Sequence, residues 1–233
     1  MQQIEISKLN QLDYHSNEAY KSLRTNVQFC GEDIKVIALT SCTPSEGKSS
    51  VSFQLALSMA EDGKKVLFVD ADIRKSVLIG RHKIVAKNIK GLTHYLSGQN
   101  KLEEVLCKTN IENLHVILTG PVPPNPSELL GGKYFKELLT TQRDKYDVII
   151  IDTPPLGSVI DSAIVSRQCD GVIMVIAADE VSYKFALKVK DQLDNAGCKI
   201  LGAVLNKVKL KGNGKYYGKY YGKYYGHYYG KED

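Results

Sequence analysis

The residues best suited to chemistry lie in segment 34–50, where an apolar run leads through a loop to Gly47, Lys48 and Ser49. A strand, a loop, Gly-Lys-Ser and a helix-like stretch, in this order, predict a phosphate-binding P-loop. Backbone N–H groups and the positive end of the helix can cradle a polyphosphate, and Lys48 adds a mobile positive charge. The residues expected to line the phosphates are Thr43, Pro44, Ser45, Glu46, Gly47, Lys48, Ser49 and Ser50.

One position departs from the usual loop pattern, GxxxxGK[ST]. Its first glycine is replaced by Cys42. Gly47 can follow any backbone path, whereas Cys42 and Ser45 must keep ordinary φ values or carry strain. Taken alone, the segment could also be an ordinary strand–turn–helix.

Two later apolar runs end in acidic residues. One ends at Asp70, with Asp72 and Arg74 close behind, and the other ends at Asp152. Ligands of open α/β sheets bind at the carboxyl ends of the strands, so these carboxylates are expected beside the phosphate site. The second run has the Walker B form, in which the acid holds Mg²⁺. Together with the loop, the two runs favour a nucleotide site over ordinary buried strands.

The residues at the loop and at the strand ends are candidates for nucleotide binding, metal binding and catalysis. Asn206, just past the last apolar run, could offer its amide to a purine base or could simply be a turn residue. Arg74 is a further candidate for contact with the nucleotide. The expected metal ligands are Ser49, Asp72 and Asp152, and the expected catalytic residues are Lys48, Asp70, Asp72 and Asp152.

Strand-like and helix-like segments alternate regularly along the chain. This alternation predicts an α/β fold with a mostly parallel β-sheet and helices on both faces. We expect an N-terminal helical extension over residues 1–33, a P-loop domain over 34–208 and a C-terminal tail over 209–233. Segment 91–106 reads as two short helical pieces in a surface excursion.

A helix is predicted over residues 16–29, capped by Ser16 or Asn17, with an apolar stripe. Its charged residues recur every third position and so share a face. That face could be a solvated surface or a contact between subunits. The stripe is formed by Ala19, Leu23 and Val27, and the charged residues are Glu18, Lys21 and Arg24.

The net charge of +5 comes from the end of the chain. Seven lysines and two acids follow Asn206, which leaves 24 basic and 24 acidic residues before them. A nucleic acid is therefore not expected as the main partner. The five cysteines form no CxxC pair, and neither a signal peptide nor a membrane-spanning apolar run is recognisable, so a cytoplasmic protein is expected.

The last residues repeat Tyr-Tyr-Gly-Lys, with one histidine variant. Glycine and lysine in every repeat leave too little apolar surface to fold, so we predict a disordered tail. A sticky low-complexity segment is the alternative to a functional one. The eight tyrosines concerned are Tyr216, Tyr217, Tyr220, Tyr221, Tyr224, Tyr225, Tyr228 and Tyr229.

The chain resembles the bacterial tyrosine kinases, P-loop proteins related to partition ATPases, and in particular the stand-alone cytoplasmic type found with capsule and exopolysaccharide systems. The resemblance implies an ATP- and Mg²⁺-dependent autokinase that phosphorylates its own tyrosine cluster in trans, with Asp70 orienting the acceptor tyrosine. The matching segments are TSCTPSEGKSS, VLFVDADIRK, VIIIDTPP, PPNPSELL, EAYKSLRTNVQF and the tail.

The same resemblance implies partners. It suggests a ring, an octamer by analogy, whose contact motif ExxRxxR would here be Glu18, Lys21 and Arg24. Lysine lacks the bidentate fork of arginine, which would weaken this contact. A membrane-anchored activator would dock through its cytoplasmic segment and recruit the kinase to the inner face of the membrane, and a cognate phosphatase would reverse the reaction.

Two other functions deserve comparison. A partition or division-site ATPase switch would carry a lysine where Thr43 stands, and it would not need eight tail tyrosines. An iron–sulfur carrier on a related scaffold would need cysteine ligands at a subunit interface, which scattered apolar cysteines do not suggest.

Overall fold

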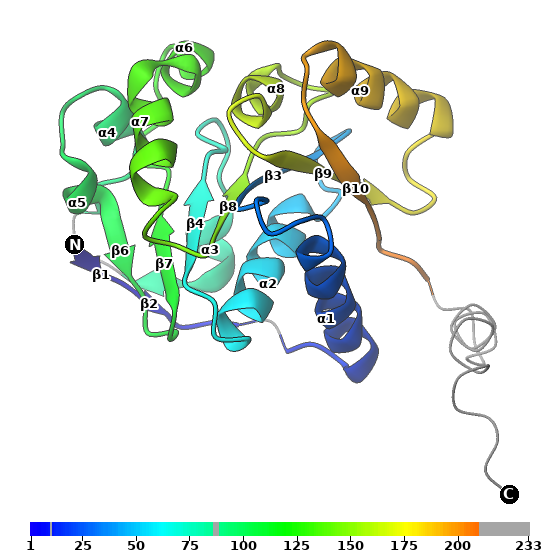
Figure 1. Ribbon diagram of the computed structural model, residues 1–233, viewed down its shortest axis with the longest axis horizontal. Coiled ribbons are helices and arrows are strands. Elements are labelled where there is room, and N and C mark those ends of the chain that lie inside the picture. The colour runs from blue at the N-terminus through cyan, green and yellow to red at the C-terminus, as the bar shows by residue number, and fades with distance from the viewer. Residues whose placement is uncertain (10, 86–88, 210–233) are drawn as a thin grey trace, which may run out of the picture.

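The computed structural model describes residues 1–9, 11–85 and 89–209, and a central sheet organises them (Figure 1). Among these residues the sheet has eight strands in the order β1-β6-β7-β4-β8-β3-β9-β10, and a second sheet pairs β2 with β5. Neighbouring strands of the central sheet run parallel except β6 and β7. The strands are β1 (Gln2–Gln3), β2 (Glu5–Ile6), β3 (Val36–Ser41), β4 (Val66–Asp70), β5 (Ile84–Val85), β6 (Leu106–Lys108), β7 (Leu114–Ile117), β8 (Val148–Asp152), β9 (Gly171–Ala177) and β10 (Ile200–Asn206).

Helices cover both faces of this sheet and enclose two hydrophobic cores (Figure 1). One core lies under α1 and α2, where Phe53 meets Phe68 edge-on at 5.4 Å between ring centroids. The other lies under α6 to α9, around Phe135 and Leu193. The helices are α1 (Tyr14–Gln28), α2 (Lys48–Glu61), α3 (Leu78–His82), α4 (Leu92–Leu96), α5 (Leu102–Val105), α6 (Pro126–Gly131), α7 (Lys133–Gln142), α8 (Asp161–Ser166) and α9 (Tyr183–Asn195).

The three central strands β3, β4 and β8 are buried at every position. A parallel sheet that is covered on both faces requires such continuous apolar runs, which is why the sequence revealed them. The predicted α/β fold, with a mostly parallel sheet between layers of helices, is confirmed.

The N-terminal segment is more than a helical extension. Helix α1 forms as predicted, but it starts at Tyr14, and Asp13 is the cap because its carboxylate accepts from the Ser16 N–H at 2.7 Å. The expected cap at Ser16 or Asn17 is therefore wrong. Strands β1 and β2 were not predicted, since two residues are too few to show an alternating pattern. They pair with β6 and β5.

Segment 91–106 contains the two short helices expected, α4 and α5. Leu92, Leu96 and Val105 are buried in the core under α6 to α9, so the segment is part of the packed body and not a surface excursion. Gly91 permits this close packing, because a Cβ atom there would lie 2.3 Å from the backbone nitrogen of Gly120.

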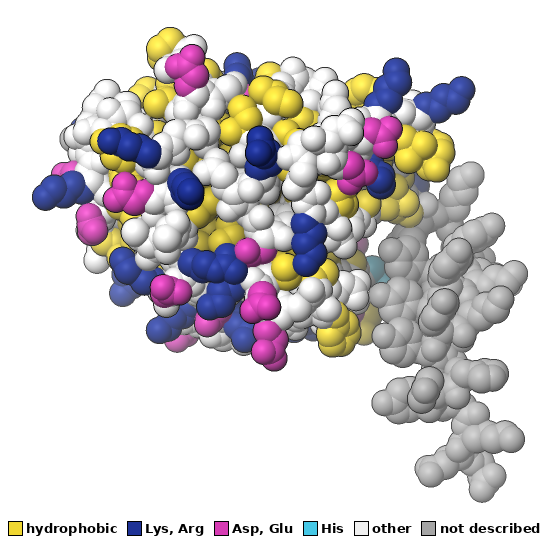
Figure 2. All heavy atoms as spheres, turned by 45° about the horizontal axis from the view of Figure 1, so that its top comes forward, with side chains coloured by type: hydrophobic (Ala, Val, Ile, Leu, Met, Phe, Trp, Pro, Cys, Tyr) yellow, Lys and Arg dark blue, Asp and Glu magenta, His cyan; other side chains and the backbone are white. Residues whose placement is uncertain are grey.

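The surface carries mixed charges on the face shown in Figure 2, where Lys and Arg side chains are interspersed with Asp and Glu. A basic stripe of the kind that binds nucleic acid is not seen on that face. Within the described ranges, no helix combines the length and the apolar character needed to cross a bilayer.

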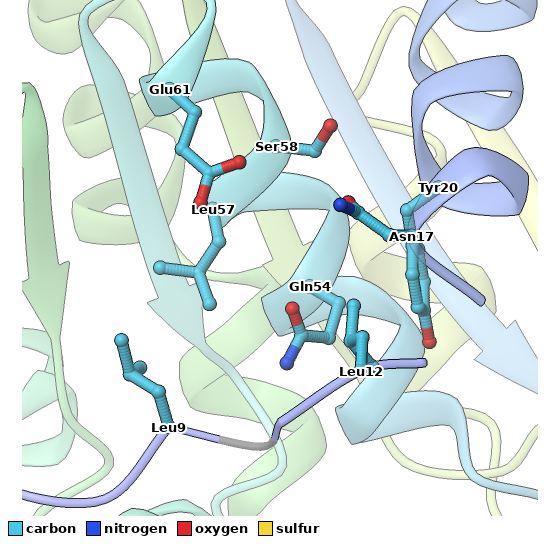
Figure 3. A pocket seen from close by; sticks show the side chains of 8 residues that line it. All are labelled: Leu9, Leu12, Asn17, Tyr20, Gln54, Leu57, Ser58 and Glu61. Atoms are coloured by element: carbon cyan, nitrogen blue, oxygen red, sulfur yellow. The ribbon is translucent and has the colours of Figure 1, made fainter. Parts of the chain in front are cut away.

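A hollow of about 200 Å³ lies between α1, α2 and the segment before α1 (Figure 3). Leu9, Leu12 and Leu57 give it apolar walls, and Gln54 projects into it from α2. Gln54 is 6% exposed, and its amide nitrogen has no hydrogen-bond partner among the described residues. A buried donor without an acceptor costs stability.

Replacing Gln54 by Leu should therefore raise the free energy of unfolding by about 1 kcal/mol, measured by urea denaturation. Gln142→Leu is the matched control, because Gln142 is also buried, at 2% exposure, but its amide donates to the Thr141 hydroxyl at 3.1 Å. That variant should lose stability. A destabilised Gln54→Leu protein would show that the amide is satisfied in solution.

Candidate active site

The loop between β3 and α2 has the backbone that a P-loop needs. Gly47 is the N-cap of α2 with φ 86°, and Ser45 also lies in the left-handed region with φ 69°. Cys42 keeps an ordinary φ, so the missing first glycine imposes no strain. Strain instead falls on Ser45, at the exposed tip of the loop, because a left-handed residue other than glycine costs about 1 kcal/mol or more.

Glu46 fastens this loop to the body of the protein. Its side chain is 1% exposed, and its two oxygens accept from the N–H and hydroxyl of Thr43 and from the N–H of Ala177 at 2.9 Å. The Asn206 amide nitrogen donates to the Glu46 carbonyl at 2.9 Å. Glu46 and Asn206 thus position the loop through contacts with the ends of β9 and β10, whereas a contact of Asn206 with a base remains a prediction.

Gly47 and Ser45, the two loop residues with a left-handed backbone, should differ in how substitution affects the affinity for ATP. Gly47→Ala should lower the affinity for ATP at least tenfold, because a Cβ atom would lie 2.2 Å from the Asn206 amide nitrogen at an unfavourable φ. Ser45→Gly should keep that affinity and leave the stability unchanged or raised by up to about 1 kcal/mol. Calorimetric titration and thermal unfolding measure both; equal behaviour of the two variants would contradict the assigned loop geometry.

The strand order places the acidic residues next to this loop. Because β8 lies between β4 and β3, Asp70 and Asp152 stand opposite each other at the ends of paired strands. Lys48 reaches across from α2, with its Nζ 2.7 Å from Asp152 Oδ1 and 3.2 Å from the Ser49 hydroxyl. Ser52 also donates to Asp152, at 2.9 Å. The structure therefore brings together the predicted loop and two of the predicted carboxylates.

Asp70 and Asp72 complete the acidic group. Asp70 is 2% exposed, and burial, followed by repulsion from Asp152, raises the pKa of its carboxyl. Burial also raises the pKa of Asp72. Asp70 accepts from the Ser76 hydroxyl and from the Asp72 N–H at 3.3 Å, and Asp72 accepts from the Lys75 N–H at 3.1 Å. A site with this excess of buried carboxylate is suited to binding cations.

Magnesium fits the oxygen ligands of this site. The hydroxyl of Ser49 and the carboxylates of Asp72 and Asp152 are the hard oxygen donors that Mg²⁺ prefers. In the described part of the chain, no three Asp, Glu, His or Cys side chains form a metal cage by themselves. Mg²⁺ does not need one, since it usually keeps several waters and is shared with substrate phosphates.

Two basic residues near the site differ in their partners. Arg74 makes a bidentate pair with Asp161, at 2.7 and 3.0 Å, and it also donates to Ser127. Its guanidinium is thus held by α8 and α6, and contact with a nucleotide remains a prediction. Arg81 of α3 donates to the Ser50 hydroxyl.

Asp161 is a residue of the site that the sequence patterns did not indicate. It is fully buried and accepts from both Arg74 and Ser127, so it fixes the loop after β4. An acid in the first turn of a helix is common at the surface, and nothing local distinguishes this one. The only signal was the PPNPSELL segment, which contains its partner Ser127.

The three residues of the expected subunit contact, Glu18, Lys21 and Arg24, do not point in the same direction. Lys21 pairs with Glu18 at 2.8 Å on the exposed side of α1. Arg24 instead turns toward α2, where it donates to the Ser58 carbonyl at 2.9 Å and pairs with Asp62 at 3.3 Å. The three residues do not form one exposed face. The predicted phosphoacceptors Tyr216 to Tyr229 lie outside the described residues.

The cysteines are free thiols, and three of them are buried. Burial raises the pKa of Cys42 to about 11, so the thiol beside the loop stays protonated. The described residues contain no cysteine cluster that could hold metal.

Comparison with known proteins identifies the family. A family model described as an AAA domain matches residues 34–195. The chain is 45% identical over 210 residues to the tyrosine-protein kinase CpsD of Streptococcus agalactiae, which covers 89% of this chain and 90% of that protein. The chain belongs to the bacterial tyrosine-kinase family.

Solved structures agree with this assignment. The kinase domain of the Escherichia coli tyrosine kinase ETK is 34% identical, with a TM-score of 0.77 over 84% of this chain and 79% of that chain. The septum site-determining protein MinD of Pyrococcus horikoshii, solved with Mg-ADP, is 26% identical, with a TM-score of 0.64 over 80% and 76%. The tyrosine kinases thus share this fold with a division-site protein, as expected from the related partition ATPases.

Proposed function

We propose that this tyrosine-kinase family member is an ATP-dependent autokinase that phosphorylates its own C-terminal tyrosines and acts in capsular or extracellular polysaccharide synthesis and export. The observation that carries the proposal is the buried group of Lys48, Asp70 and Asp152 beside a P-loop. Its 45% identity to a tyrosine-protein kinase and its eight tail tyrosines support the choice of acceptor.

Binding of the nucleotide would draw on groups that already surround the loop. Backbone N–H groups at the start of α2 would face the phosphates, and Lys48, now 2.7 Å from Asp152, would extend to the outer ones. Ser49, Asp72 and Asp152 would hold Mg²⁺. When bound, the ion neutralises charge on the transferring phosphoryl group. Lys48 thus neutralises the charge of Asp152 in the structure and would neutralise phosphate charge when the nucleotide is bound.

Asp70 would orient the hydroxyl of the acceptor tyrosine. With ordinary pKa values near 4 and 10, full proton transfer from phenol to carboxylate would cost roughly 8 kcal/mol. Burial and Asp152 raise the pKa of Asp70, which narrows this difference. In a loose transition state the proton can leave late, so a carboxylate that only orients the hydroxyl suffices.

The proposal is tested by mapping phosphotyrosine on purified protein incubated with ATP and Mg²⁺. Lys48→Met should lower labelling about 100-fold or more, because the phosphate charge loses its counter-ion. A second full-length variant with the eight tail tyrosines changed to Phe should bind ATP normally and incorporate almost no phosphate.

Two controls accompany these variants. Lys48 neutralises the buried Asp152, so the Met variant should also be less stable, and circular dichroism must show that it is folded at the assay temperature. An ATPase switch would hydrolyse ATP and label no tyrosine in any variant. That result, or strong labelling of the Phe variant, would contradict the proposed autokinase.

We further propose a ring of subunits that uses the exposed Glu18 and Lys21 of α1. In this arrangement Arg24 supports the contact from inside by fixing α1 on α2. Glu18→Ala/Lys21→Ala should reduce the mass measured by light scattering and leave monomer stability unchanged. Arg24→Ala should lower the free energy of unfolding by about 1.5 kcal/mol. Unchanged mass in the first variant would exclude this contact.

The family resemblance also supports a membrane-anchored activator that recruits the kinase to the inner face of the membrane, and a cognate tyrosine phosphatase. Both proposals are compatible with an autokinase, whose activity can be controlled and whose phosphates can be removed. Labelling with and without the cytoplasmic segments of candidate membrane proteins tests the activator directly.

A further inference from the structure

Ser76 lies in the turn between β4 and α3, six residues beyond Asp70. Its hydroxyl donates to Asp70 Oδ2, and its oxygen accepts from the Leu78 N–H at 3.3 Å. The side chain is partly buried, and none of the sequence patterns pointed to it. It connects the first residue of α3 directly to the carboxylate at the end of β4.

The Asp70 carboxylate has few other constraints. It is 2% exposed at the end of its strand, and its other oxygen accepts from the Asp72 N–H at a longer 3.3 Å. Asp152 stands opposite it in the strand register, and the attraction of Lys48 partly offsets the repulsion between the two carboxylates. The Ser76 hydroxyl on Oδ2 limits the rotation of this carboxylate, and the orientation of a reacting group affects rate steeply.

We propose that Ser76 is a positioning residue for phosphoryl transfer, which holds the Asp70 carboxylate in the orientation needed to receive the acceptor hydroxyl. The proposal rests on the proposed function, in which Asp70 orients the tyrosine. In this role Ser76 would act through Asp70 and not through contact with the nucleotide.

Helix α3 links the contact between Ser76 and Asp70 to the P-loop helix α2. Its first residue donates to Ser76, and its Arg81 donates to Ser50 at the start of α2. A single short helix is thereby tied to the acid at the end of β4 and to the P-loop helix. A shift of α3 would disturb the Asp70 carboxylate through Ser76.

A purely structural role is the competing explanation, since Ser76 also accepts from a backbone N–H at the start of α3. The two roles differ in whether the effect of replacing Ser76 depends on an intact Asp70. A positioning residue loses its effect when Asp70 is already disabled, whereas a structural residue affects the fold and the rate regardless of Asp70.

The test compares full-length Ser76→Ala, Ser76→Thr, Asp70→Asn and the double variant Ser76→Ala/Asp70→Asn. Initial rates of tail phosphorylation and the Kd for ATP are measured for each. Ser76→Ala should lower kcat about tenfold with the Kd for ATP changed less than about twofold. Ser76→Thr should recover most of the rate, and the double variant should be no slower than Asp70→Asn alone.

Ser97→Ala is the matched control, because that hydroxyl also donates within the chain, to the Thr93 carbonyl at 2.7 Å, but Ser97 is the C-cap of α4. Its rate should equal that of the unmodified protein. Thermal unfolding is followed in parallel, and Ser76→Cys, which keeps the shape with a weak donor, repeats the comparison if the alanine variant unfolds.

A normal rate in Ser76→Ala, or a loss that adds to that of Asp70→Asn, would overturn the positioning role. Either result would leave the autokinase intact, provided that the unmodified protein labels its tail and Lys48→Met does not. Absence of labelling in the unmodified protein would instead refute the proposed function.

Discussion

The ion pair between Lys48 and Asp152 is the interaction on which the site depends. Both side chains are almost fully buried, and their charged atoms are 2.7 Å apart. Burying two charges is costly, and removing one partner leaves the other uncompensated. With Asp70 opposite Asp152, the site holds more acid than base. This imbalance costs stability and at the same time makes the site suited to a cation. The phosphates of a bound nucleotide would in turn attract Lys48 away from Asp152.

Several contacts hold the parts of this site at fixed distances. Glu46 ties the loop to the end of β9, and Asn206 ties it to the end of β10. Arg74 and the buried Asp161 join the segment after β4 to α8. These supports come from two strands of the sheet and from a helix packed on it. The site is therefore preorganised by the body of the protein and not by the loop alone, which suits a reaction that relies on positioning and charge.

Helix α1 connects the site to the proposed assembly. Its inner side is fixed on α2, the helix that begins with Lys48, through Arg24 and the buried Val27. Its outer side exposes Glu18 and Lys21. A neighbouring subunit that pulls on α1 would therefore act on the helix that carries the P-loop, which gives the proposed ring a direct physical route to the site.

The sequence by itself determined the fold class, the P-loop and the acid-ended strands, and the family. Buried parallel strands must be apolar along their length, and a phosphate loop needs particular residues at fixed spacing, so both leave local patterns. The tertiary structure alone decided that Asp161 holds Arg74, that Ser76 holds Asp70 and that Arg24 faces inward. The contacts of Arg74 with Asp161 and of Arg24 with α2 join segments that are distant in the sequence. The direction of a polar side chain depends on which donors and acceptors the packed fold brings within reach.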